Sequence, residues 1–282
     1  MGSDLINCVT VIVPVKNEED NLPACLEALK RFSNVVVVDS GSTDRTEDIA
    51  LSFGVELLQF NWNGQFPKKR NWVLQTYAFT TEWVLFLDAD EVVDDEFCDE
   101  LLEKVETTTG VGFWISYTNY FMGRKLRHGV PQKKLACFKV GSGAYEKIDE
   151  IRWSNLDMEI HEHPILDGDI EYVRAPIEHR DYRGLARFIE RHVDYAKWEA
   201  QRYAALQKRS TEKLEKHTSR QAFKYKNIDK SWFPLFYFFY TYIVRMGFMD
   251  GVSGYYYAYY KKWYFITVGN IIREQKKGDR FY

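Results

Sequence analysis

Three carboxylates follow a run of apolar residues in Trp83–Glu91, which reads WVLFLDADE. The apolar part, Trp83–Leu87, predicts a strand buried on both faces of a sheet. Because an unpaired buried charge is strongly unfavourable, Asp88, Asp90 and Glu91 are expected at the carboxyl end of this strand, where open α/β sheets bind ligands. Carboxylates at positions i and i+2 suit a hard divalent cation such as Mg²⁺ or Mn²⁺. The alternative is an acidic first turn of a helix.

The elements that would position these carboxylates alternate between strand and helix over the first 95 residues. Predicted strands lie at Cys8–Val15, Val35–Val38, Val55–Phe60 and Trp83–Leu87, with helices beginning near Asn21, Thr43 and Lys68. This alternation predicts an α/β fold with a mixed, mostly parallel sheet and right-handed crossovers. Polar loops follow strand after strand, at the edge where a nucleotide would bind.

The pattern changes after Asp94. A helix is predicted at Phe97–Val105 and an alternating strand at Gly112–Tyr120. Residues 121–150 are rich in glycine and are expected to be loops, and a short strand follows at Ile170–Val173. Residues 183–225 have helical periodicity.

Charge is distributed unevenly along the 282 residues. Residues 1–182 contain 18 Lys and Arg against 32 Asp and Glu, whereas residues 183–282 contain 20 against 9. The two parts are therefore expected to have different partners: the acidic part suits metal-dependent chemistry and the basic part an anionic surface. Four scattered cysteines without metal-ligand spacing indicate a reducing compartment, and the first residues predict no secretory signal.

Aromatic residues dominate the segment 231–282. Its stretch Trp232–Val244 reads WFPLFYFFYTYIV, and basic residues follow from Lys261 onward. Thirteen residues are too few to span a bilayer, which needs about 20. Tyr and Trp prefer the membrane interface and Lys and Arg favour anionic headgroups, so the segment is expected to lie on an anionic membrane. A helical hairpin packed on the body, or on another subunit of a homo-oligomer, is the alternative.

Four motifs in order, VIVPVKNEEDNL, VVVVDSGSTDRT, KKRNW and WVLFLDADE, resemble the family 2 glycosyltransferases, which have the GT-A fold. The match covers roughly the first 95 residues. Within that family the chain resembles bacterial lipopolysaccharide-core glucosyltransferases, through Phe121–Gly129 (FMGRKLRHG), Ile160–Pro164 (IHEHP) and the predicted helix between His179 and Arg202. The resemblance implies transfer of a sugar from a nucleotide sugar.

The donor site implied by this resemblance centres on a DXD motif. Asp90 would bind the metal directly, and Asp88 would face the ribose or the metal shell. Asp39 would meet the base, and Arg70 would lie near the pyrophosphate, with Lys68 or Lys69 as a helper. The nucleoside pocket would be lined by Pro14, Asn17 and Glu18. The alternative for the basic triplet, Lys68–Arg70, is a solvated helix start.

Inverting transfer also needs a general base for the acceptor hydroxyl. Glu162 matches the acidic residue that family members carry downstream of the DXD motif. The alternatives are that Glu162 forms a structural ion pair, or that Asp157 or Glu159 is the base. Of its two neighbours, His161 or His163 could complete the metal shell, since imidazole binds Mn²⁺.

The basic stretch Arg124, Arg127, His128 and Lys133 could bind phosphates or carboxylates of an acceptor, or form a solvated loop. The residues together predict a GT-A catalytic domain over 1–182, with the nucleotide sugar bound by 1–95 and the acceptor by 96–182. Residues 183–282 would form a helical extension.

The predicted activity is metal-dependent, inverting transfer from a nucleotide sugar, uridine-linked by resemblance, to a membrane-borne glycan or lipid-linked acceptor. The expected location is cytoplasmic, on the inner face of the plasma membrane, with no nucleic-acid partner. The rivals are a degenerate carbohydrate- or membrane-binding module and a nucleotidyltransferase. The second usually has a glycine-rich loop after its first strand, where this chain has KNEED.

Overall fold

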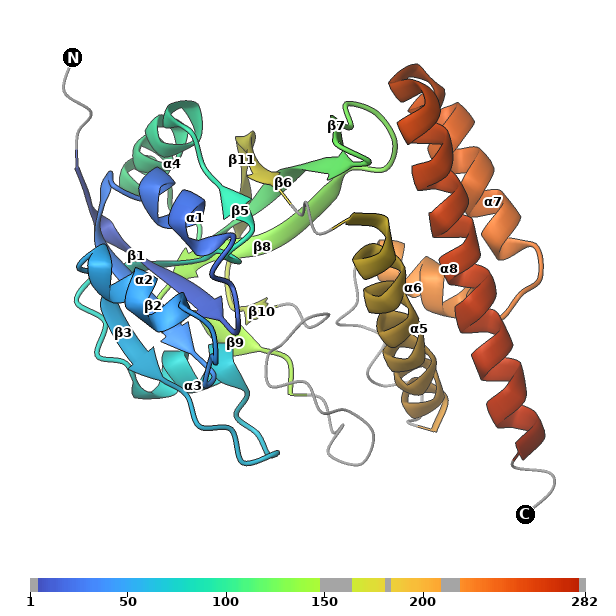
Figure 1. Ribbon diagram of the computed structural model, residues 1–282, viewed down its shortest axis with the longest axis horizontal. Coiled ribbons are helices and arrows are strands. Elements are labelled where there is room, and N and C mark those ends of the chain that lie inside the picture. The colour runs from blue at the N-terminus through green and yellow to red at the C-terminus, as the bar shows by residue number, and fades with distance from the viewer. Residues whose placement is uncertain (1–4, 148–163, 181–183, 209–218, 279–282) are drawn as a thin grey trace. The chain divides into compact units, whose positions relative to one another are not determined.

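The chain forms two compact units (Figure 1). The sheet unit comprises Met1–Asn119 and Pro131–Arg180, and the helical unit comprises Tyr120–Val130 and Asp181–Tyr282. The structure, a computed structural model, describes residues 5–147, 164–180, 184–208 and 219–278. The division differs from the predicted boundary at residue 182 chiefly because the hairpin at Tyr120–Val130 belongs to the helical unit.

Strands and helices alternate at the start of the sheet unit, as predicted. The first part comprises β1 (Ile6–Val15), α1 (Leu22–Ala28), β2 (Phe32–Asp39), α2 (Thr46–Ser52), β3 (Glu56–Gln59), α3 (Lys69–Thr76) and β4 (Trp83–Phe86). The second part comprises β5 (Glu91–Val92), α4 (Asp95–Thr107), β6 (Gly112–Phe121), β7 (Arg124–Lys125), β8 (Gln132–Lys139), β9 (Gly143–Tyr145), β10 (Pro164–Leu166) and β11 (Ile170–His179).

The main sheet has the strand order β3-β2-β1-β4-β8-β6-β11-β5, and β7 pairs with β6. The first four strands in this order are mutually parallel, because each is joined to the next along the chain by a helical crossover. β8 pairs antiparallel with both β4 and β6, whereas β6 and β11 are parallel. This mixed, mostly parallel sheet flanked by helices is the GT-A architecture that the sequence predicted.

Alternation along the buried strands produces two cores. In β1 the side chains of Val9 and Val11 point to the face covered by α1 and α4, whereas Ile12 points to the face covered by α3. In β4 the same alternation sends Leu85 to the first face and Phe86 to the second. A strand that is apolar on both faces is therefore required at each of these positions, which explains the continuous apolar runs in the sequence.

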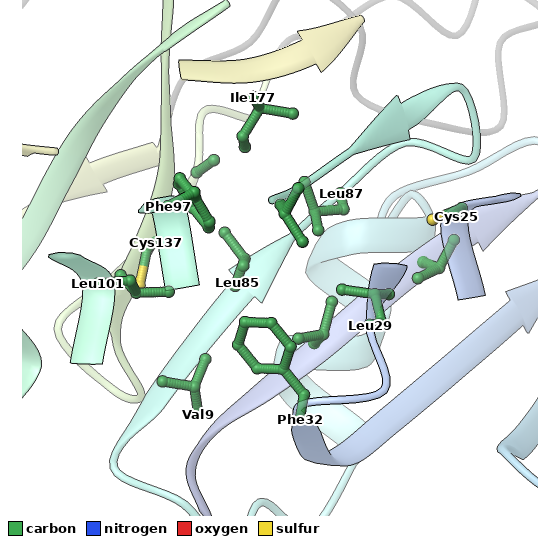
Figure 2. Packing of buried hydrophobic residues seen from close by; sticks show 14 of the residues in the cluster. Val9, Cys25, Leu29, Phe32, Leu85, Leu87, Phe97, Leu101, Cys137 and Ile177 are labelled. Carbon is green, nitrogen blue, oxygen red and sulfur yellow. The ribbon is translucent and has the colours of Figure 1, made fainter. Parts of the chain in front are cut away.

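Figure 2 shows the first core, where α1 and α4 pack on the sheet. Leu29, which directly follows α1, and Phe97 from α4 lie with Leu85 of the central strand β4, and all three are fully or nearly fully buried. Burying each such side chain stabilises the fold by about 1.5–3 kcal/mol. This packing fixes the position of β4, and with it the carboxylates that follow.

The sequence interpretation missed the long strand β8 and the short strands β5, β7, β9 and β10, and it ended β11 too early. Residues 121–150 are not mainly loop: β8 crosses the centre of the sheet, and its run from Leu135 to Phe138 is buried. The glycines that predicted loops lie in the turns that bound this strand. β11 extends to His179, six residues beyond its predicted end, through an irregularity between Val173 and Ile177 that accommodates Pro176.

The helical unit contains α5 (Gly184–Lys208), α6 (Ser219–Asn227), α7 (Phe233–Phe239), the π-helix η2 (Tyr240–Val244), the 3₁₀-helix η3 (Gly247–Asp250) and α8 (Gly251–Gly278). Its core joins Ala196 and Ala200 of α5 to Phe233 of α7 and Phe265 of α8. A helical extension is thus present, as predicted. Among the described residues, the helices are all too short or too polar to cross a membrane.

Candidate active site

The predicted donor site lies at one edge of the sheet unit, where parallel strands end. Val15, at the end of β1, pairs with Asp39 at the end of β2, and Ile12 pairs with Phe86 at the end of β4. Because the three strands run in the same direction, the loops that follow them emerge at the same edge. This edge therefore brings together the loops that carry the predicted nucleotide and metal residues.

The loops after β1 and β2 are tied together by polar contacts. Asn17 has left-handed backbone geometry (φ 54°), and its Oδ1 accepts a hydrogen bond from the backbone N–H of Thr43 at 2.7 Å. The buried carboxylate of Asp39 accepts hydrogen bonds from the N–H groups of Gly41 (2.9 Å) and Ser42 (2.8 Å). Gly41 has φ 74°, which favours glycine in this turn. Asp39 therefore holds the conformation of the loop after β2. This is the loop where Asp39 was predicted to contact the base of the nucleotide.

Three further residues surround the same loops. Pro14 is buried within β1, and Glu18 accepts a hydrogen bond from the side-chain amide of Asn21 at 2.7 Å. The hydroxyl of Ser40 is buried and has no hydrogen-bond partner among the described residues. A buried donor without a partner is unusual, so this hydroxyl is suited to meet a bound molecule.

The start of α3 connects two strand ends. Lys68 is buried and precedes the helix. The Lys69 ammonium donates to the backbone carbonyl of Val15 at 2.8 Å, and the Arg70 guanidinium donates to Asp88 Oδ1 at 2.6 Å. Arg70 also lies over the ring of Tyr145, 5.4 Å from its centroid. Lys68, Lys69 and Arg70 are therefore buried and do not form a solvated helix start.

A second cation, Lys134 of β8, lies between two carboxylates. Its ammonium is 2.6 and 2.8 Å from the two oxygens of Glu91 and 3.4 Å from Asp88 Oδ2. Burial raises the pKa of Asp88, but Lys134 and Arg70 outweigh it and hold that pKa below its ordinary value. Burial raises the pKa of Glu91 to about 7; Lys134 opposes the shift, and the charge of Asp88 adds to it.

The third carboxylate, Asp90, faces a histidine. Antiparallel pairing of β5 with β11 places His179 opposite Glu91, and His179 Nε2 lies 3.3 Å from Asp90 Oδ2. The backbone carbonyl of Asp90 also accepts a hydrogen bond from the N–H of Arg180 at 2.7 Å. The end of β11 thus fixes both the backbone and the side chain of Asp90.

The alternative prediction for Asp88, Asp90 and Glu91 was that they form the acidic first turn of a helix. The helix that follows them begins later in the chain. α4 starts at Asp95, and its cap is Asp94, whose side chain accepts a hydrogen bond from the N–H of Phe97 at 2.9 Å. Asp88 and Asp90 precede β5 instead, so they are not used in capping a helix.

The donor set at this edge fits a divalent cation. A carboxylate oxygen of Asp90 and an imidazole nitrogen of His179 converge, and Asp88 lies beside them. In the described part of the chain, no group of three or more His, Cys, Asp and Glu side chains is placed to hold a metal. Mg²⁺ commonly takes only one or two protein carboxylates and completes its shell with water and substrate phosphates, so two converging ligands suffice.

The other predicted residues are either outside the described residues or in other parts of the described structure. Glu162, its alternatives Asp157 and Glu159, and both His161 and His163 fall outside the described residues. Lys133, at the end of the basic stretch, belongs to the sheet unit, where its ammonium lies 4.5 Å from the ring centroid of Tyr172.

Arg124, Arg127 and His128 belong to the helical unit. Arg124 is exposed in β7, and the backbone N–H groups of Arg127 and His128 donate to the carboxylate of Asp250 at 3.1 and 2.8 Å. His128 Nδ1 lies 3.1 Å from the same carboxylate. The turn that carries this basic stretch is therefore held by an acidic residue of η3.

Comparison with known proteins defines the family. The model of "Glycosyl transferase family 2" matches residues 10–162, more than half of the chain. The chain belongs to glycosyl transferase family 2. This family assignment agrees with the fold and with the order of the four motifs.

Relatives in this family cover different parts of the chain. It is 25% identical over 170 residues to the lipopolysaccharide core biosynthesis glycosyltransferase LpsC of Rhizobium meliloti, covering 56% of this chain and 57% of LpsC. It is 37% identical over 91 residues to glycosyltransferase SunS of Bacillus phage SPbeta, covering 31% of this chain and 21% of SunS. The chain therefore spans about a fifth to three fifths of the length of these relatives.

A solved structure of Staphylococcus aureus TarS, residues 1–349 in complex with UDP, is 29% identical to this family 2 chain. The match covers 44% of this chain and 38% of that chain, with a TM-score of 0.36.

Sequence reasoning missed Lys134 and His179, which lie beside the predicted carboxylates. Lys134 lies in a strand that was interpreted as loop, and His179 ends a strand that was predicted to stop at Val173. Alternation of Val173, Ala175 and Ile177 was the signal for the longer strand.

Proposed function

We propose that the protein transfers a sugar from a UDP-linked donor to a membrane-borne glycan or lipid-linked acceptor, with inversion at the anomeric carbon. The observation that carries the proposal is the position of two close pairs, Arg70 with Asp88 and His179 with Asp90, at the edge of the sheet where parallel strands end. Family 2 membership supports glycosyl transfer and counts against the nucleotidyltransferase alternative.

Asp90 and His179 would hold a divalent cation, whose chemistry is to neutralise the departing diphosphate as a Lewis acid. Arg70 adds a positive charge next to Asp88, which follows the end of β4. Asn17 and Asp39 shape the two loops that would enclose the nucleoside, and the Ser40 hydroxyl offers it a hydrogen bond. These side chains are preorganised, so little reorganisation is needed when charge develops on the leaving group.

The reaction is a single displacement. The acceptor oxygen forms a bond to the anomeric carbon while the bond from that carbon to the diphosphate oxygen breaks. Glu162 takes the proton of the acceptor hydroxyl as the general base, a role proposed from its place in the sequence. The acceptor side includes Arg124, Arg127 and His128, whose charges suit phosphates or carboxylates of a lipopolysaccharide core or another lipid-linked glycan.

The donor half of the proposal is tested by calorimetry with UDP, GDP and dTDP, with and without Mn²⁺. We expect UDP to bind in a Mn²⁺-dependent manner to the wild type and at least tenfold more weakly to Asp90→Asn, because the amide is a poor metal ligand. Asp94→Asn is the matched control, since Asp94 caps α4. Equal UDP binding by the wild type and Asp90→Asn would contradict the metal assignment, and binding of none of the nucleotides would favour a degenerate module.

The proposed location follows from the acceptor. An enzyme that uses a cytoplasmic nucleotide sugar and a membrane-borne acceptor would act on the cytoplasmic face of the plasma membrane. The aromatic, basic helical unit supports this proposal.

A further inference from the structure

Exposed apolar side chains are concentrated in one part of the helical unit. Most of the exposed large apolar side chains of the described residues lie between Trp232 and Ile266, in α7, η2, η3 and the first half of α8. We call six of them the apolar face: Trp232, Phe236, Phe239, Val244, Phe248 and Val252. Val244 and Val252 are 66% and 67% exposed, an unusual environment for β-branched apolar residues.

The same helices also have a well-buried side. Phe233 of α7 and Phe265 of α8 are 2% and 6% exposed, and their rings meet edge to face with centroids 5.0 Å apart. These helices have therefore already packed one side in the core of the helical unit. None of the six side chains of the apolar face belongs to that core.

The charge of this stretch has one sign at the surface. Between Lys230 and Arg273 the sequence contains one acidic residue, Asp250. Its side chain is 8% exposed and accepts the hydrogen bonds of the hairpin turn. The basic residues in the same range are Lys230, Arg245, Lys261, Lys262 and Arg273. An approaching surface thus meets exposed apolar groups and cations but no exposed carboxylate from this stretch.

We infer that the apolar face docks on the surface of an anionic lipid bilayer. Phe, Trp and Val side chains would enter the headgroup region while the cations meet lipid phosphates. Lys262 has a suitable arrangement, since its ammonium lies 5.0 Å from the ring centroid of Tyr259 and 5.5 Å from that of Phe238, with the stem on apolar surface. Lysine is depleted in interfaces between proteins, so this composition favours lipid over a second copy of the chain. The inference deepens the proposed function. The connection between membrane docking and a membrane-borne acceptor rests on that proposed function.

Flotation of the full chain with vesicles tests the inference. Vesicles of phosphatidylcholine are compared with vesicles that also contain phosphatidylglycerol. We expect binding to the anionic vesicles that falls roughly tenfold in Val244→Ser/Val252→Ser, because the variant removes two inserting side chains. The matched control is Leu5→Ser/Leu51→Ser, which changes two apolar residues of the sheet unit that are each 61% exposed.

A second pair of variants tests the charge. Lys262→Gln should weaken binding to anionic vesicles about fivefold, as expected for one cation at a membrane surface. The exposed Lys30 of the sheet unit provides the control Lys30→Gln, which should bind like the wild type. Circular dichroism of each variant verifies that the helical unit is folded.

Two outcomes would overturn the inference. One is equal flotation of the wild type and Val244→Ser/Val252→Ser. The other is a dimer in solution that this variant converts to a monomer without loss of flotation, which would assign the apolar face to a second copy of the chain. UDP calorimetry on the same samples distinguishes failure of membrane docking from failure of the donor site, because none of these substitutions lies at the strand ends.

Discussion

Two buried carboxylates, one in each unit, have similar surroundings and different consequences. Glu91 of the sheet unit is 2% exposed and is bound by the ammonium of Lys134. Glu199 of the helical unit is 3% exposed and is bound by the ammonium of Lys224 at 2.8 Å and the hydroxyl of Tyr264 at 3.3 Å. Both satisfy the rule that a buried charge needs a partner, so burial with pairing does not by itself identify a functional site.

The neighbours of the two carboxylates separate their roles. Glu199 is surrounded by donors: burial raises the pKa values of the Tyr225 and Tyr264 hydroxyls well above their ordinary range, and the charge of Glu199 adds to the shift. Glu91 has Asp88 and Asp90 beside it, and the side chain of Asp88 is 35% exposed. A cluster of carboxylates with one accessible member, here Asp88, attracts a further cation, whereas an enclosed carboxylate among donors stabilises helix packing.

Removing the cation of the sheet-unit cluster is expected to have the largest effect in this comparison. Lys134→Met leaves Glu91 and Asp88 without their shared partner, which should lower the free energy of unfolding by about 3 kcal/mol and weaken UDP binding roughly tenfold. Urea unfolding and calorimetry measure the two effects. Lys133→Met is the control, because the Lys133 ammonium lies over the Tyr172 ring and outside the cluster. Wild-type values for Lys134→Met would show that the cluster does not depend on Lys134.

Removing the carboxylate of the helical unit should have a smaller effect and should not affect nucleotide binding. Glu199→Leu deprives Lys224 and Tyr264 of their acceptor, but Lys224 is 27% exposed and can turn to water. We expect a loss of about 2 kcal/mol in the free energy of unfolding with unchanged UDP binding. Glu190→Leu, at an exposed position of the same helix, is the control. A loss of UDP binding in Glu199→Leu would contradict the distinction between the two carboxylates.

A further prediction concerns pH. The pKa of Glu91 is about 7 in the folded chain against an ordinary value of 4.5, so between these values the folded chain retains a proton that the unfolded chain releases. This carboxyl therefore makes the free energy of unfolding decrease as pH rises from about 4.5 to about 7. Metal-free Glu91→Gln should show a flatter pH dependence over this interval, whereas the exposed Glu103→Gln should follow the wild type. Parallel pH profiles for Glu91→Gln and the wild type would mean that Glu91 stays charged in the folded chain.

The sequence could predict the positions that depend on local patterns. Asp88 and Asp90 follow an uninterrupted apolar run, which predicts a strand at the centre of an α/β sheet. The carboxyl end of such a strand lies at the edge of the sheet where ligands bind. The first strands and helices were predictable for the same reason, because each element carries its own periodicity. Some boundaries shifted. β2 begins at Phe32 rather than at Val35. α2 begins at Thr46 rather than near Thr43, since residues 42–44 are engaged with the loop after β1.

The partners of those carboxylates could not be predicted from local patterns. Lys134 meets Glu91 because β8 is inserted antiparallel beside β4, and His179 meets Asp90 because β11 pairs with the two-residue strand β5. Both pairings join segments more than 40 positions apart in the sequence. Each depends on strand order, which periodicity within a segment does not specify.

The beginning of α3 has a consequence for how this protein can change. Lys69, Arg70 and Asn71 bind three different parts of the sheet unit: the carbonyl of Val15, the carboxylate of Asp88, and the backbone N–H and carbonyl of Tyr145. Inserting or deleting one residue within this turn would rotate all three side chains away from their partners together. In the segment 61–65 before the helix, the side-chain hydrogen bonds of Trp62 and Asn63 go to the segment's own backbone, although the Trp62 ring also packs against the second core. Length variation is therefore expected to accumulate before α3 and to be excluded from its first turn.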